Sequence, residues 1–323
     1  MTTTAITVIS AHSSTAILGF DTSILAGQVA PSSMRLYAQD LAAYLQFAEY
    51  SADVALRPST LARWRNHLVQ NTTQSANTIN RRLSGVKSTF KWAAEVEEGC
   101  ISARLAEEFA QVRGVKAKAL KERQPEDNRT WMEPAEIRKI ASAPDATRLS
   151  GKMHRALLFT LASSACRISD VCGLTQSQIA LAADDKGCPG WCLMVTGKNE
   201  TKPEARPITQ EAHGYIQEWL AARAAAGVTS EYVFTAFAGR GDSRLSDKPL
   251  STAGAWQMVQ RYAAQVGLVH IKPHDFRRSA GTAVHEKYGL LAAQKLLGHK
   301  DSNTTARHYI KPKKLINVTE GLF

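Results

Sequence analysis

Residues 274–309 read HDFRRSAGTAVHEKYGLLAAQKLLGHKDSNTTARHY and form the most informative part of the chain. Their pattern predicts helices near residues 275–288 and 290–297. His274 and Arg277 are three residues apart, which places them on the same side of the first helix. Both side chains could therefore face a single phosphate, although a His and an Arg at this spacing also occur together by chance.

Two more residues of this stretch can carry chemistry, His299 and Tyr309. His299 follows Gly298 at the expected end of the second helix, so a histidine that caps the helix is the alternative interpretation. Tyr309 follows a polar run, residues 304–308, in which core packing of the ring is less favoured but stays the alternative.

Upstream of this stretch, Arg167 lies in the segment SACRISD, residues 164–170, among small and apolar side chains. A guanidinium in a partly buried position must meet an anion, because leaving its charge unpaired there is costly. A structural ion pair with Asp170 is the alternative to an anionic ligand.

A β-ribbon is predicted for residues 191–196 and 205–208, with a polar turn between its strands. Lys198 lies at this turn, where a solvated lysine is the default expectation and Lys202 is an equally good candidate. Further helices are predicted near residues 134–143, 150–163, 211–225 and 252–266.

The first part of the chain also follows a helical pattern. Three segments, starting at Pro31, Pro58 and Ser75, place apolar residues at intervals of three and four. At 323 residues the chain is long enough for about two domains. We expect a flexible N-terminus, a helical domain, a basic linker and a larger second domain, with the boundaries 1–20, 21–112, 113–131 and 132–323.

Positive charge extends over both expected domains. Lysine and arginine number 40 against 29 aspartates and glutamates, a formal net charge of +11. Such a balance favours a polyanionic partner, and an excess of basic residues in both domains favours one long enough to touch both. The candidate contacts lie on the third helix and in the linker, where a solvated charged face is the alternative: Arg81, Arg82, Lys87, Lys91, Lys116, Lys118 and Lys121.

Missing features exclude several function classes. The five cysteines have no zinc-ligand spacing, which favours reduced, buried thiols in a cytoplasmic protein. Residues 1–20 lack the basic start of a secretory signal, and no apolar run is long enough for a membrane span. Gly197-Lys198 lacks the earlier glycine of a P-loop, and His285-Glu286 lacks the second histidine of a zinc protease.

Six residues whose side chains could take part in catalysis occur in this order: Arg167, Lys198, His274, Arg277, His299 and Tyr309. With the surrounding motifs CRISD, CGLT, TGK, HDFRR and LGHK, they resemble the tyrosine recombinase, or phage integrase, family of site-specific DNA recombinases. The resemblance covers residues 132–310, and the helices before it resemble the core-binding domain of that family. Tyr309 lies ten positions after His299 where the family pattern has nine, so His308 occupies the usual position, but only Tyr309 offers a phenol.

The resemblance implies a role for each residue. Arg167 and Arg277 would hold the non-bridging oxygens of a phosphodiester, His299 would bind the same phosphate, and Asp170 would steady the site around Arg167. Tyr309 would be the nucleophile with His274 as its general base, and Lys198 would protonate the departing 5′ oxygen. The product would be a covalent 3′-phosphotyrosine, formed without a metal or another cofactor.

The implied fold is mainly α with a small β-sheet: an N-terminal helical core-binding domain followed by an α+β catalytic domain. The implied partner is double-stranded DNA, bound by a homotetramer on two duplexes, with a monomer in solution as an option and accessory DNA-bending proteins unknown. The alternatives are a topoisomerase-like or hairpin-forming enzyme and a non-catalytic DNA-binding regulator. The apolar tail, residues 315–323, is expected to dock on its own domain or on a neighbouring protomer.

Overall fold

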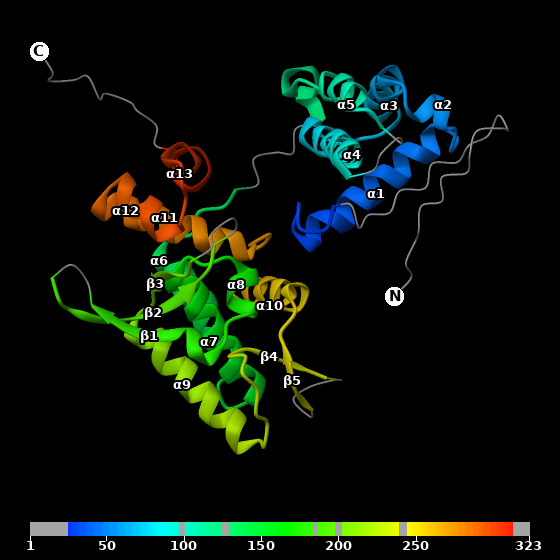
Figure 1. Ribbon diagram of the computed structural model, residues 1–323. Coiled ribbons are helices and arrows are strands. Elements are labelled where there is room, and N and C mark those ends of the chain that lie inside the picture. The colour runs from blue at the N-terminus through cyan, green and yellow to red at the C-terminus, as the bar shows by residue number, and fades with distance from the viewer. Residues whose placement is uncertain are drawn as a thin grey trace, which may run out of the picture. The chain divides into compact units, whose positions relative to one another are not determined.

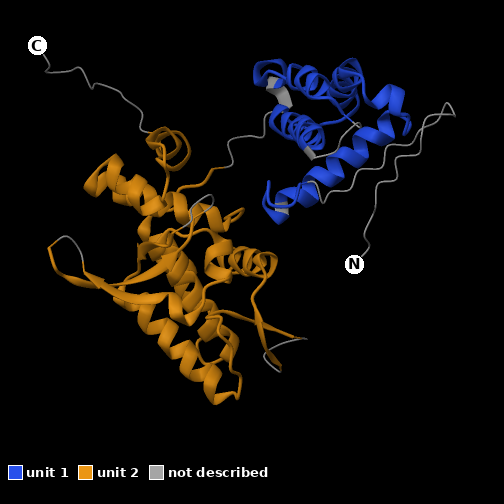
Figure 2. Ribbon diagram, viewed as in Figure 1, with its two compact units in different colours: residues 1–128 blue, residues 129–323 orange. Residues whose placement is uncertain are grey.

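The computed structural model describes residues 25–96, 101–123, 129–183, 186–197, 202–238 and 244–312. The chain forms two compact units, residues 1–128 and 129–323 (Figure 2), and each has a hydrophobic core of its own. Lys198 and the apolar tail at residues 315–323 lie outside the described ranges. No helix within these ranges is both long enough and apolar enough to cross a membrane.

The first unit is built from helices: α1 (Pro31–Phe47), α2 (Ala52–Ala55), α3 (Pro58–Asn71), α4 (Ala76–Val96), α5 (Ala103–Ala110) and the 3-10 helix η2 (Ala117–Arg123) (Figure 1). Helices α1 and α3 begin with proline, whose fixed φ favours the first helical turn. An N–H at this position would have no partner within the helix, so the lack of one in proline costs no hydrogen bond. The apolar stripe of α4 is buried, with Ile79, Val86 and Phe90 inaccessible to solvent. The three predicted helices correspond to α1, α3 and α4.

The segment predicted as a linker, residues 113–131, begins within the packed part of this unit. Asn80 on α4 donates from Nδ2 to the carbonyl of Val115 (2.9 Å) and accepts the N–H of Val115 at Oδ1 (2.7 Å). Leu120 of η2 is buried in the core of the same unit. Residues 113–120 are therefore anchored to the first unit.

The second unit combines helices with two small antiparallel sheets (Figure 1). Its helices are α6 (Pro134–Ser142), α7 (Leu149–Ser164), α8 (Ile168–Cys172), the 3-10 helix η3 (Gln176–Gln178), α9 (Gln210–Ala225), α10 (Thr252–Gln265), α11 (Pro273–Tyr288), α12 (Leu290–Leu297) and α13 (Ser302–Tyr309). Its strands are β1 (Ile179–Ala183), β2 (Pro189–Val195), β3 (Glu204–Pro207), β4 (Thr235–Phe237) and β5 (Leu245–Pro249). This mainly helical fold with small sheets confirms the predicted fold class.

The larger sheet has the order β1-β2-β3, and all its pairs are antiparallel. Strands β2 and β3 form the predicted ribbon, in which Leu193 lies opposite Arg206. On its other side, Leu193 lies opposite Ile179 of β1, a strand that was not predicted. The sequence of β1 is IALAA, which has no alternation of polar and apolar residues to mark a strand.

Helix α7 packs against α6, α9 and α11 in the core of the second unit. Leu157 of α7, Trp219 of α9 and Phe276 of α11 are all inaccessible to solvent. Helices α11, α12 and α13 pack on one another next to this core (Figure 1). One core therefore fixes both the end of α7, close to Arg167, and the start of α11, which carries His274.

The four described cysteines are free thiols. Cys166, Cys172 and Cys192 are buried, and this burial raises the pKa of each thiol. Cys188 is exposed immediately before β2, so the expectation of buried thiols is wrong at this position. It lies between two strands of a hairpin, where the side chain does not reach the core.

Candidate active site

Arg167 lies where the chain changes direction between two helices. Helix α7 is followed by Ala165, which has a left-handed conformation with φ of 52°, and α8 begins at Ile168. The Asp170 carboxylate accepts the backbone N–H of Arg167 (3.1 Å) and so fixes the start of α8. The guanidinium is more distant, because Nη1 lies 4.0 Å from Oδ2, and the Arg167 side chain is 33% exposed. Asp170 therefore contacts the backbone of Arg167 more closely than it contacts the guanidinium of Arg167.

Arg277 of α11 is the buried centre of the site and is 2% exposed. Its Nη1 donates to the carbonyl of Ala165 and its Nη2 to that of Leu297, so one guanidinium joins the ends of α7 and α12. Nη2 also donates to Nε2 of His299 (3.2 Å). Burial lowers the pKa of Arg277, and its interaction with Tyr309 opposes that shift. The guanidinium stays charged at neutral pH.

His299 is held in one tautomer by its neighbours. Arginine can only donate, so the hydrogen bond from Arg277 assigns a lone pair to Nε2. The proton then belongs to Nδ1, which donates to Oγ1 of the buried Thr305 on α13 (2.8 Å). His299 therefore connects α11 to α13 as a neutral imidazole.

His274 is placed by the first turn of α11, directly after Pro273. Asp275 is fully buried and accepts the backbone N–H of Lys272 (2.8 Å). The same carboxylate accepts a hydrogen bond from Nη1 of Arg278 (2.7 Å). These contacts fix the turn that carries His274.

Tyr309 is the last residue of α13, and its side chain packs among the other site residues with 8% exposure. Its ring centroid lies 4.4 Å from that of His299 and 5.1 Å from that of His274. Cζ of Arg277 lies 5.4 Å from the same centroid. Two imidazoles and a guanidinium surround the phenol, which distinguishes Tyr309 from a purely apolar core position.

Both site histidines are neutral at pH 7. Burial lowers the pKa of His274 to about 4, and the nearby charges of Arg278, Arg277 and Arg167 contribute to this shift. Burial also lowers the pKa of His299 to about 4, with Arg277 and Arg167 again contributing. The charge of Arg167 therefore contributes to the lowered pKa of both imidazoles. A neutral imidazole with charged neighbours can accept a proton when an anion enters the site.

Arg206 of β3 is a neighbour of the site that the sequence analysis did not single out. It is 5% exposed, pairs with Glu204 (2.8 Å) and donates from Nη1 to the carbonyl of Lys295 (3.0 Å). Gly298 lies so close that an added Cβ would stand 1.9 Å from Nη2 of Arg206. Arg206 thus supports the turn that leads to His299. Its signal in the sequence is a charged residue within a predicted strand, which more often faces solvent.

The structure brings five of the six predicted catalytic residues together in one unit. The sixth, Lys198, lies outside the described residues, and Lys202, its alternative, is exposed shortly before β3. In the described ranges, no group of three or more His, Cys, Asp or Glu side chains is arranged to hold a metal ion.

Three of the basic residues predicted to contact a polyanion have partners inside the first unit. Arg81 and Arg82 both bind the buried Asp40 of α1, at 2.6 and 3.3 Å. Lys87 donates to the carbonyl of Val112, just after α5, and burial lowers its pKa. These side chains stabilise the packing of α4, which sequence analysis did not predict, and their DNA contacts remain predictions.

The other predicted contacts are more accessible. Lys91, Lys116 and Lys118 are exposed, and Nζ of Lys91 lies 4.8 Å from the ring centroid of Trp92. The side chain of Lys121 lies outside the described part of the chain. Exposed ammonium groups can approach a phosphate backbone without first breaking an internal contact.

The geometry of the site suits chemistry at a phosphate. Two guanidiniums can each donate paired hydrogen bonds to phosphate oxygens and stabilise the negative charge that gathers there during nucleophilic attack. A neutral imidazole beside the phenol can accept the proton that the phenol loses on attack.

Comparison with known protein sequences gives consistent matches over both units. A sequence model of the phage integrase family matches residues 130–315, and one of the phage integrase N-terminal SAM-like domain matches residues 20–97. A tyrosine recombinase XerD of Neisseria meningitidis serogroup A is 30% identical over 180 residues, 54% of this chain and 56% of that protein. A tyrosine recombinase XerC of Xanthomonas axonopodis pv. citri is 28% identical over 300 residues, 86% of either chain.

Solved structures show the same fold. A lambda integrase tetramer bound to a Holliday junction has a TM-score of 0.59 at 18% identity, covering 90% of this chain and 75% of that chain.

The chain spans about half the length of the XerD relatives it matches. The family match to residues 130–315 extends over more than half of the chain. The chain therefore belongs to the phage integrase family of tyrosine recombinases.

Proposed function

We propose that the chain is a site-specific DNA recombinase that cuts and rejoins strands through a covalent 3′-phosphotyrosine. The observation that carries this proposal is the grouping of Arg277, His274 and His299 around the buried ring of Tyr309, with the charge of Arg167 acting on both imidazoles. Family membership supports it, because the matched relatives are named tyrosine recombinases.

The proposed step is an in-line displacement at phosphorus. The Tyr309 oxygen forms a bond to phosphorus, the bond from phosphorus to the 5′ oxygen breaks, and the phenol proton passes to His274. Lys198 gives a proton to the departing 5′ oxygen. Arg167 and Arg277 stabilise the charge on the non-bridging oxygens, so the step needs no metal ion or other cofactor. Because the phosphotyrosine bond replaces the phosphodiester bond, a 5′ hydroxyl can reverse the step.

DNA binding changes the protonation of the site in this proposal. A phosphate between the guanidiniums brings negative charge close to His274 and His299, which raises the pKa of both imidazoles from about 4. A raised pKa makes His274 a better proton acceptor. It also allows His299 to carry a proton on Nε2 and donate it to the phosphate, once Nη2 of Arg277 has turned from Nε2 to a phosphate oxygen.

Double-stranded DNA is the proposed substrate, and a homotetramer on two duplexes is the proposed assembly. The net charge of +11 supports binding to a polyanion. The lambda integrase of similar fold forms a tetramer on a Holliday junction, which supports the assembly. A non-catalytic regulator is less favoured, because a regulator has no need of two histidines and an arginine beside Tyr309.

Replacing Tyr309 tests the nucleophile. Tyr309→Phe removes only the hydroxyl, so we expect it to bind DNA with wild-type affinity and to form no covalent adduct. Tyr288→Phe is the matched control, since Tyr288 is 65% exposed at the end of α11. The measurement is adduct trapping on nicked suicide substrates that carry the recombination site, mapped from host DNA, followed by mass spectrometry of the linked peptide.

An adduct in Tyr309→Phe, or one mapped to another tyrosine in the wild type, would contradict the assignment. Binding of the mapped site by the wild-type protein without any cleavage would favour the regulator instead. Cleavage and resealing with no exchange between two sites would favour a topoisomerase-like enzyme.

A further inference from the structure

The segment that leads into α6, residues 129–133, contacts the end of α13 in a regular register. Three pairs make these contacts: Arg129 Nη1 donates to the Arg307 carbonyl (2.8 Å), Trp131 Nε1 donates to the Tyr309 carbonyl (3.3 Å), and Lys311 Nζ donates to Glu133 Oε1 (3.1 Å). The two members of every pair are 178 residues apart. The order of the three contacts shows that the two segments run in the same direction past each other.

Helix α11 supplies further donors to the same helix end. Oγ1 of Thr282 donates to the Tyr309 carbonyl (2.9 Å) and accepts the backbone N–H of Lys311 (3.1 Å). Nε of Arg278 donates to the carbonyl of His308 (3.2 Å). The last carbonyls of a helix have no partner within the helix, and here three of them in succession receive side-chain donors from other elements.

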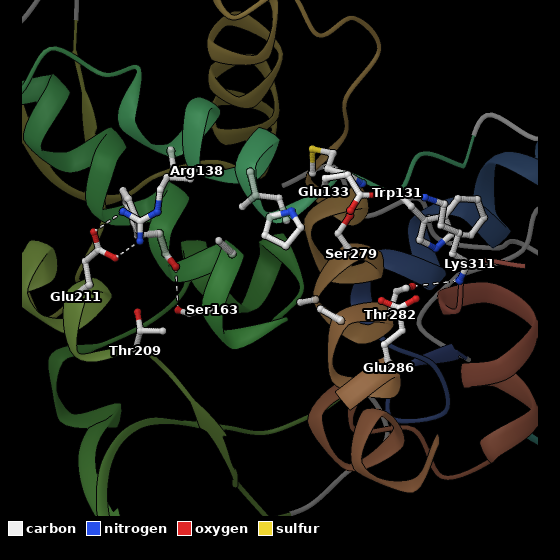
Figure 3. A pocket seen from close by; sticks show the side chains of 18 residues that line it. Trp131, Glu133, Arg138, Ser163, Thr209, Glu211, Ser279, Thr282, Glu286 and Lys311 are labelled. Atoms are coloured by element: carbon white, nitrogen blue, oxygen red, sulfur yellow. Dashed lines mark hydrogen bonds and ion pairs between the residues drawn. The ribbon is translucent and has the colours of Figure 1, made fainter. Parts of the chain in front are cut away.

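These contacts decide where the phenol stands. Helix α13 has only eight residues, too few to be stable without tertiary contacts. Figure 3 shows Trp131, Thr282 and Lys311 grouped on one side of a cavity of about 420 Å³. Trp131 and Thr282 both hold the main chain of Tyr309 itself, so a shift of either would move the phenol relative to a bound phosphate.

We propose that Trp131 is a positioning residue for Tyr309 and that residues 129–133, the clasp segment, fix the backbone of the nucleophile. This inference rests on the proposed function, because it assigns Trp131 a role in the attack by Tyr309. The clasp segment directly follows the residues that join the two units in sequence.

The test removes one hydrogen bond and keeps an aromatic ring. Trp131→Phe lacks the indole N–H, so we expect the single-turnover cleavage rate on saturating nicked DNA to fall about fivefold to tenfold. The Kd for DNA should stay at the wild-type value. Religation should slow by the same factor, because the Tyr309 oxygen must be aligned in both directions. Trp191→Phe is the matched control: Trp191 is stacked on His213 with ring centroids 3.6 Å apart, and its cleavage rate should not change.

A second variant separates positioning from general stability. Thr282→Val keeps the volume of this buried side chain but removes the other donor to the Tyr309 carbonyl. Each single variant leaves that carbonyl one donor. The double variant leaves it without either, so its rate should fall by more than the product of the two single effects.

The outcomes separate this inference from the proposed function. If the wild-type protein forms no adduct at Tyr309, the proposed function fails. If the wild type forms the adduct and Trp131→Phe cleaves bound DNA at the same rate, only the role of Trp131 is overturned. An unchanged rate overturns that role even if the melting temperature falls, because a purely structural contact alters stability and leaves the rate of the bound complex unchanged.

Discussion

At the scale of single residues, the site depends on two imidazoles that burial and, to a smaller extent, nearby arginines keep neutral. His274 and His299 lie close enough to Arg277 and Arg167 to be affected by both charges. An imidazolium there would lose hydration and be repelled by the guanidiniums. The site is therefore poised to receive negative charge and is destabilised by protonation in its absence.

This arrangement predicts acid sensitivity of the DNA-free protein. The pKa of both imidazoles is about 4 in the folded state and about 6.5 in an unfolded chain. Between these values the unfolded chain binds more protons, so the free energy of unfolding falls as the pH is lowered from 6.5 to 4. Thermal unfolding should show this loss in the wild type and a shallower pH dependence in the double variant His274→Gln, His299→Gln.

The comparison has an internal control. Above pH 8 both imidazoles are neutral in the folded and in the unfolded state. The melting temperatures of wild type and variant should therefore change with pH in the same way there. Equal pH dependence of the two proteins between pH 6.5 and 4 would show that other groups govern acid unfolding. Bound DNA should weaken the acid sensitivity of the wild type, because phosphate stabilises the imidazolium forms.

At the scale of elements, the end of α12 is shaped by β3. Gly298 ends α12 in a left-handed conformation, with φ of 61°, and lies against the guanidinium of Arg206. That guanidinium is held by Glu204 and by the carbonyl of Lys295, so moving it aside would disturb both contacts. A strand of the small sheet thereby sets the turn that carries His299.

Gly298→Ala tests this contact. Gly267 is the matched control, because it also has a positive φ, 81°, but an added Cβ there meets nothing within 4 Å. Both alanine variants carry the conformational penalty of about 1 kcal/mol or more. We expect Gly298→Ala to lose at least about 1 kcal/mol beyond that in chemical denaturation, and also to cleave DNA more slowly. Equal losses in the two variants would show that Arg206 moves aside freely.

At the scale of the whole molecule, positive charge extends over both units, but not every basic residue is available to DNA. Asp40 binds Arg81 and Arg82, whereas Lys116 and Lys118 are exposed after α5. Binding to DNA releases counterions in proportion to the phosphates neutralised. The exposed lysines are therefore the better candidates for binding of DNA by the first unit.

The double variant Lys116→Met, Lys118→Met should bind DNA more weakly and with less salt dependence. The slope of log K against log salt should become shallower by about 0.9 for each phosphate that the variant no longer neutralises. Arg104→Met is the control, since Nε of this exposed guanidinium already lies 3.2 Å from Glu108. Fluorescence anisotropy over a salt series measures both slopes, and an unchanged slope in the double variant would remove these lysines from the interface.

Much of the fold follows from the sequence alone. Long helices such as α1, α4 and α11 carry an apolar period and begin with proline or a polar cap, both of which are local signals. Two short elements were not predicted: α8 has only five residues, and the eight residues of α13, SNTTARHY, include too few apolar side chains to show the helical period that marks α12. Their positions come from contacts with α7, α11 and α12.

The residue types of the candidate site could likewise be predicted from the sequence, but their arrangement in space could not. Residue types in a fixed order, within motifs that resemble those of the tyrosine recombinase family, predicted Arg167, His274, Arg277, His299 and Tyr309 as site residues. Only the tertiary structure decided the tautomer of His299, the support from Arg206 and the hold of Trp131 on Tyr309. The physical reason is distance along the chain: hydrogen bonds between residues up to 178 positions apart leave no local pattern and exist only once the chain has folded.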